Sequence, residues 1–129
     1  MVAVLLHPAH LLLTSSKTAF TWGYGHYFVF SSAAAIGAGL AVSVDYDSRE
    51  AHIGAFGAGA AVAVPVAVFL ASLWLVHIRP HRPGALVRTA YLAGIVLVLV
   101  TPFTSLPLPL IAGVMILLVL AGQRQGTRT

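Results

Sequence analysis

The residue types that could carry chemistry in this chain gather around His26. It lies in the run Trp22-Gly23-Tyr24-Gly25-His26-Tyr27, at the start of a long apolar segment. An ionisable residue in or beside a membrane span is a functional candidate by default, and imidazole exchanges a proton near neutral pH. His77 lies at the end of the next apolar segment. If the two segments are antiparallel helices, both histidines lie at one membrane depth, where they could relay a proton, bind an anion, or ligate a metal or haem.

A simpler interpretation of this run stays open. Trp22, Tyr24 and Tyr27 are typical of the aromatic belt at a membrane interface, so His26 could be an anchor that donates to a backbone carbonyl. We count Tyr24 with the two histidines as a candidate functional residue. Gly23 and Gly25 are expected to free the backbone at a helix start, or alternatively to let it approach a ligand.

No other pattern in the sequence indicates catalysis. A nucleophile–base pair, a phosphate-binding loop and a zinc-ligand spacing are all missing, and the chain has no cysteine. The acidic group Asp45, Asp47 and Glu50 falls short of the six to eight oxygens that calcium takes. We therefore predict that the protein is not an enzyme and has no catalytic residue, no metal site and no cofactor.

The composition predicts a membrane protein. Hydrophobic residues make up 59% of the chain, the mean hydropathy is +0.95, and only 8% of residues are charged, against about 25% in soluble domains. The ranges 18–44, 51–78 and 89–123 contain no Asp, Glu, Lys or Arg, and about 20 helical residues cross a bilayer. Despite a pI near 10.1, the basic residues lie in short clusters beside apolar segments. We expect a multi-pass protein of the cell (inner) membrane, in contact with lipid and not with nucleic acid.

The expected fold is an all-α bundle of four transmembrane helices. A short N-terminal segment, interfacial or truncated, is expected over 1–21, with a polar loop at 14–21. The four-span domain covers 22–123, and a basic cytoplasmic tail covers 124–129. The helices are predicted at about 24–44, 52–78, 85–101 and 108–122. Pro65 is expected to kink the second helix, and an alternative makes 89–122 one re-entrant hairpin.

Charge and small residues predict how these helices are oriented and packed. Lys17, the group Arg79, Arg82 and Arg88, and the pair Arg124 and Arg128 fall on one side of the membrane, which predicts that both termini are cytoplasmic. Small residues four or five positions apart allow close helix approach. The predicted packing positions, facing other transmembrane helices of a homo-oligomer or of a missing N-terminal part, are Ala33, Gly37, Ala41, Gly54 and Gly59.

The order of these features resembles the C-terminal portion of the bacterial low temperature requirement A family. The resemblance covers about 20–122 and rests on Tyr24-Gly25-His26 opening a span, on the glycine-rich end Gly37-Ala38-Gly39-Leu40, and on three further spans. Members are large multi-pass proteins of unassigned activity. They resemble one another in an N-terminal Glu-Leu-Phe-Phe-Asp-Leu type of motif, which this chain lacks, and in an acid where this chain has Ala41. The resemblance therefore implies that the chain could be a fragment, a truncated product or one piece of a complex.

Three functional hypotheses follow. The first is a transporter-like or channel-like piece in which His26 handles protons or a solute. The second is a non-catalytic packing or assembly module of a larger membrane protein or oligomer. The third is a small haem carrier that uses His26 and His77. Transporters place polar groups near the bilayer midplane, and the predicted midplane has no ionisable group, which counts against transport by this chain alone.

Overall fold

The computed structural model describes residues 16–126, with side chains to residue 124, and within this range it contains helices and turns but no strand. The long helices are α2 (Ser16–Asp47), α3 (Ala55–Leu73), α4 (Ala85–Val100) and α5 (Pro107–Gly126). A π-helix, η1 (Trp74–Ile78), and a 3₁₀-helix, η2 (Arg79–His81), continue α3, and a second 3₁₀-helix, η3 (Thr101–Phe103), continues α4. With these extensions, four helices are long and apolar enough to cross a membrane. For these residues, the prediction of an all-α fold with four helices long enough to cross a membrane is confirmed.

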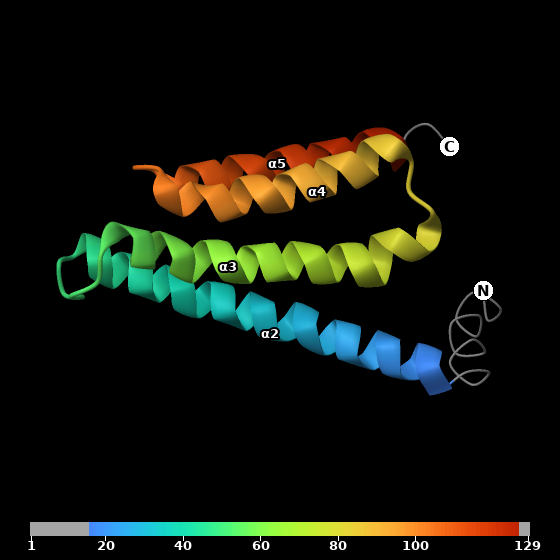
Figure 1. The fold of residues 1–129 in the computed structure, drawn as a ribbon, viewed down its shortest axis with the longest axis horizontal. Coiled ribbons are helices and arrows are strands. Elements are labelled where there is room, and N and C mark those ends of the chain that lie inside the picture. Colours follow the sequence, from blue (N-terminus) through green and yellow to red (C-terminus); the bar gives the residue numbers. More distant parts are fainter. Residues whose placement is uncertain (1–15, 127–129) are drawn as a thin grey trace.

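The four helices alternate in direction, and α3 lies in the middle (Figure 1). α2 runs along one side of α3 and contacts α3 and η1, while α4, α5 and η3 pack on the other side. The bundle is therefore built around α3, with α2 at its edge. The start of α2 and the end of α5 lie at the same end of the molecule as the turn that follows η2 (Figure 1).

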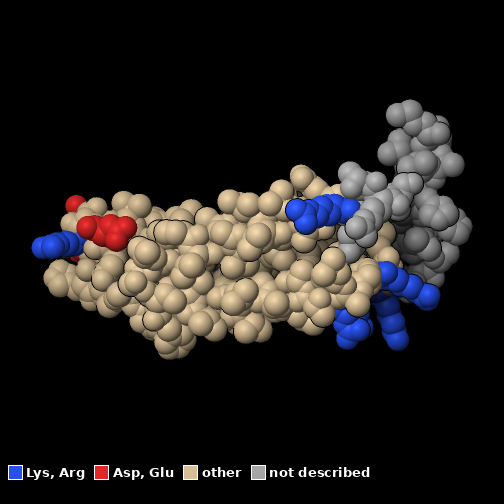
Figure 2. All heavy atoms as spheres, turned by 90° about the horizontal axis from the view of Figure 1, so that it is seen from above, with Lys and Arg blue, Asp and Glu red and all other residues tan. Residues whose placement is uncertain are grey.

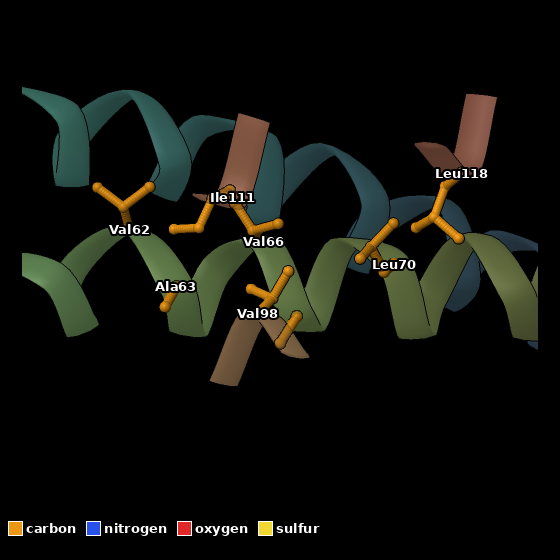
Figure 3. Close-up of a cluster of buried hydrophobic side chains, with 8 residues drawn as sticks. Val62, Ala63, Val66, Leu70, Val98, Ile111 and Leu118 are labelled. Carbon is orange, nitrogen blue, oxygen red and sulfur yellow. The ribbon is translucent and has the colours of Figure 1, made fainter. Parts of the chain in front are cut away.

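The buried core is centred on α3 (Figure 3). Its members are Val62, Ala63, Val66, Ala67 and Leu70 from α3, Val98 from α4, and Ile111 and Leu118 from α5. Ala63 and Val98 are completely inaccessible. Two glycines let the helices come close: a Cβ at Gly59 would lie 3.2 Å from Pro102 Cα, and one at Gly94 would lie 2.9 Å from a Leu118 methyl group. Most large apolar side chains outside this core are exposed, as expected for a surface that faces lipid.

Several predicted helix boundaries differ from the structure. The polar loop predicted at 14–21 is wrong over its described part, because α2 begins at Ser16 and not near Tyr24. The hydroxyl of Thr21 donates to the Lys17 carbonyl oxygen at 2.9 Å, so this polar residue satisfies itself within the helix. α5 continues through the start of the predicted tail to Gly126. The rest of the predicted N-terminal segment, 1–15, lies outside the described residues.

α3 stays α-helical through Pro65. Proline has no N–H, so the carbonyl of Ala61, one turn earlier, lacks its usual α-helical donor. Serine and threonine hydroxyls inside the spans also bond to their own helices: Ser32 donates to Phe28 O at 2.6 Å, and Ser43 donates to Gly39 O at 3.1 Å. The α2–α3 contact is therefore made from helix backbones with small, self-satisfied side chains between them.

Candidate functional site

His26 from α2 and His77 from η1 lie side by side at one end of the helices. Their ring centroids are 5.2 Å apart, and the ring planes are tilted by 59°. The ring of Trp22 lies 4.1 Å from that of His26, one helical turn earlier. Trp22, His26 and His77 therefore form a contiguous cluster of rings. We call His26 and His77 the histidine pair.

The hydrogen bond of His26 determines which of its two ring nitrogens can accept a proton. Its Nδ1 lies 2.9 Å from the Trp22 carbonyl oxygen. A carbonyl oxygen can only accept, so Nδ1 carries the hydrogen and donates. In the neutral ring Nε2 is then the free acceptor for a proton. His26 is half-buried and His77 is exposed, so a proton can reach the pair from the solvent or headgroup side.

Gly25 is what lets α2 approach η1 at this point. A Cβ at Gly25 would collide with the Val76 side chain, whereas Gly23 has nothing within 4 Å of the corresponding position. Because α2 already begins at Ser16, the interpretation of these glycines as freeing a helix start is wrong. The π-helix also contributes, because an extra residue in its turn changes the register of the residues that follow, His77 among them.

Enlarging Gly25 is expected to separate the histidine pair. We predict that Gly25→Val lowers several-fold the cross-linking of a His26→Cys/His77→Cys variant by a short thiol-specific reagent, because the valine displaces α2 from Val76. The chain has no cysteine of its own, so the background is clean. Gly23→Val is the matched control and should leave the yield unchanged; equal yields in both variants would contradict the contact.

Tyr24 is not brought to the histidine pair. It is 62% exposed, and its ring stacks on that of Phe20 at 6.1 Å on the outer side of α2. A recess of about 290 Å³ lies beside Trp22, and sequence reasoning did not find it. It is lined by Lys17, Thr18, Thr21, Trp22, Leu75, Val76 and Pro80. Neither histidine is among these residues.

The predicted packing positions fall in two groups. Gly59 is buried against Pro102 and Pro107, whereas Gly54 has open space around it. Ala33, Gly37 and Ala41 are exposed, and nothing among the described residues lies within 4 Å of the Cβ position of Gly37. The buried residues of α2 are Ser32, Gly39 and Ser43, which the sequence reasoning did not select, and the last two contact the backbone of α3. The exposed face stays a predicted surface for helices outside residues 16–126.

The arrangement of His26 and His77 also bears on whether they could ligate a metal ion or a haem. No group of three His, Asp or Glu side chains among the described residues is close enough to hold a metal ion. A haem iron ligated by His26 and His77 would have to lie between the two rings with its macrocycle. The rings contact each other directly, so the arrangement leaves no room for that group.

A protein-family model matches most of the chain. The family model described as Bacterial low temperature requirement A protein (LtrA) matches residues 4–122. Neither the curated proteins nor the solved structures contain a match. The matched range includes the histidine pair, all four apolar helices except the last residues of α5, and the basic turn after α3.

Proposed function

The chain belongs to the bacterial low temperature requirement A protein family, as the resemblance predicted, and we propose that it is a proton-handling or solute-handling membrane protein whose working site is the histidine pair. Its four apolar helices make it a multi-pass membrane protein. We place it in the cell (inner) membrane, with a binding role and not an enzymatic one.

The contact between His26 and His77 carries this proposal. Imidazole is the side chain that gains and loses a proton between pH 5 and 8, and two such rings lie 5.2 Å apart on different helices. His26 keeps Nε2 free while Nδ1 is held by Trp22 O. No hydrogen bond joins the two rings among the described residues, so we propose that a proton passes between them through a bridging water.

The interior of the bundle limits the proposal to one membrane interface. The buried polar side chains among the described residues are Ser32, Ser43 and Thr101, and each bonds to a carbonyl of its own helix. Among the described residues, no Asp, Glu, His, Lys or Arg continues from the histidine pair toward the middle of the membrane. We propose that any path across the bilayer is completed by helices beyond residues 16–126.

Tryptophan fluorescence can test the proton site directly. The chain has two tryptophans, so Trp74→Phe leaves Trp22 as the single reporter. We expect its emission to fall when the solution is acidified, because a protonated His26 places a cation against the indole face. His26→Gln should abolish this response, and His52→Gln, an exposed histidine in the 48–54 connection, should preserve it.

His77→Gln distinguishes a pair from a single anchoring histidine. If the two rings share protons, removing His77 shifts the midpoint of the Trp22 response. An unchanged midpoint would show that His26 acts alone, as an interfacial anchor. A response that survives in His26→Gln would show that His26 is not the proton site.

The second candidate function is an assembly module, and the open face of α2 favours it. Ala33, Gly37 and Ala41 lie on a helix at the edge of the bundle, and Gly37 has nothing within 4 Å of its Cβ position. Such a face permits close approach of another helix. We predict that Gly37→Leu dissociates a complex of the full chain in mild detergent, observed as a loss of mass by light scattering. Gly122→Leu, at an open position on α5, should have no effect.

A further inference from the structure

The turn between α3 and α4 forms a second recess, separate from the histidine pair. It has a volume of about 360 Å³ and is lined by Trp74, Arg79, Arg82, Pro83 and Arg88. Three guanidinium groups thus border one hollow at the membrane interface. Figure 2 shows basic side chains gathered at this end of the molecule.

No Asp or Glu side chain neutralises the positive charge of this recess. The sequence has three acids, Asp45, Asp47 and Glu50, and they lie at the opposite end of the helices (Figure 2). α2 alone has 32 residues, about 48 Å at 1.5 Å per residue. That distance exceeds the screening length of about 8 Å at physiological salt. The arginines therefore have no acidic side chain of this sequence as a counter-charge.

Trp74 is the aromatic residue that lines the recess. Its indole Nε1 is buried and has no hydrogen-bond partner among the described residues. The indole N–H can only donate, and buried donors in proteins are nearly always paired. The guanidinium of Arg79 lies over the same ring, with Cζ 6.0 Å from the centroid. An anion bound by the arginines would therefore lie beside this indole.

The backbone around the recess also favours an anion. α4 starts after Gly84, which provides no side-chain cap, so its first N–H groups lack helical partners and present the positive end of the helix. Arg82 has φ of 47°, a left-handed conformation that is uncommon for a residue other than glycine. The turn therefore holds an arginine in an unfavourable backbone conformation beside an uncapped helix start.

We propose that this recess binds the phosphate group of an anionic ligand. Arginine forks match phosphate oxygens with two parallel hydrogen bonds. The position at the end of the spans suits an anionic phospholipid headgroup, and a free phosphate offers the same chemistry. The inference goes beyond the proposed function, because it involves neither His26 nor His77.

Setting the orientation of the protein in the membrane requires only charge, whereas a binding site requires the shape of the guanidinium. Arg88→Lys keeps the charge and loses the fork. We therefore expect Arg88→Lys to weaken binding about tenfold, and the Arg82→Gln/Arg88→Gln variant to weaken it about a hundredfold. Lys17→Gln removes one positive charge at the same end without touching the recess and should change affinity less than twofold.

The test titrates the full chain, purified in a neutral detergent and carrying Trp22→Phe, so that Trp74 reports from the recess. The probes are short-chain phosphatidylglycerol, short-chain phosphatidylcholine and inorganic phosphate. We expect a saturable change in Trp74 emission with phosphatidylglycerol and none with phosphatidylcholine, at equal helical content in all variants. Competition by inorganic phosphate would identify a free phosphate as the ligand; no competition at millimolar phosphate would identify the lipid headgroup.

Two results would overturn the proposal. One is equal affinity of the wild type and the Arg82→Gln/Arg88→Gln variant for both anionic probes. The other is a loss in Lys17→Gln as large as that in Arg88→Lys, since it would show attraction to the basic end as a whole. Failure here leaves the Trp22 response to pH unaffected, so the two sites are tested independently.

Discussion

Gly39→Ala is expected to lower the free energy of unfolding of the full chain by about 2 kcal/mol, because overpacking a close contact typically costs about 1–3 kcal/mol. A Cβ at Gly39 would collide with the carbonyl oxygen and carbon of Ala61 on α3. These are backbone atoms in the middle of a helix, so they cannot rotate away as a side chain can. The helices would have to move apart along their main contact.

Pro65 explains why that carbonyl faces Gly39. Proline removes the N–H that would bond to Ala61 O. The freed oxygen is then in contact with the glycine backbone of α2, where a Cα–H can approach it. Ser43, one turn along α2, places its hydroxyl 3.4 Å from Ala58 O. Gly39 and Ser43 therefore both contact backbone atoms of α3.

Gly37→Ala is the matched control on the same helix. Nothing lies within 4 Å of its Cβ position, and alanine has the higher helix propensity, so this variant should be neutral or up to about 1 kcal/mol more stable. Both variants would be unfolded in mixed micelles of mild and denaturing detergent and followed by ellipticity. Equal stability of the two variants would contradict the α2–α3 contact.

The class of protein and its four spans could be predicted because they depend on local composition. Charge-free stretches of sufficient length show wherever a helix must cross lipid. The start of α2 could not be predicted in this way, because hydropathy measures whether a segment is apolar and not whether it is helical. Lys17 and Thr21 are polar, yet they continue the helix, and the Thr21 hydroxyl bonds to its own backbone.

The packing face of α2 shows a different limit. Ala33, Gly37 and Ala41 satisfy the spacing of small residues, but so does Gly39 with Ser43 on another face of the same helix. When nearly every side chain is small, spacing alone does not select the face that meets the neighbour. The carbonyl freed by Pro65 belongs to α3, so the choice depends on a tertiary contact.

The two sites were predictable to different degrees. That His26 and His77 share one end follows from counting antiparallel spans, and the structure brings their rings into contact. The collision that Gly25 avoids with Val76, and the π-helical turn that carries His77, arise only when α2 and α3 are packed together. The basic turn is visible in the sequence, but the buried donor of Trp74 beside it is not.

The orientation of the helices in the membrane can be tested by labelling cysteines from one side, and the expected difference between sites is nearly all or none. The described basic residues outside the 48–54 connection lie at one end of the helices, namely Lys17, Arg79, Arg82, Arg88 and Arg124, and the acids lie at the other (Figure 2). Short loops rich in Lys and Arg stay in the cytoplasm. We therefore predict that Ser48→Cys and Ser105→Cys react with a membrane-impermeant maleimide in intact cells, and that His81→Cys reacts only after permeabilisation.

This labelling pattern also decides between four spans and a re-entrant hairpin over 89–122. Ser48 and Ser105 lie in the two connections at the acidic end, so four full spans expose both to the outside. A hairpin that turns back within the bilayer would leave Ser105→Cys unreactive while Ser48→Cys still reacts. The reverse pattern, with His81→Cys alone accessible, would place the basic end outside. The arginine recess would then face the outer leaflet, and the source of its phosphate ligand would have to be sought there.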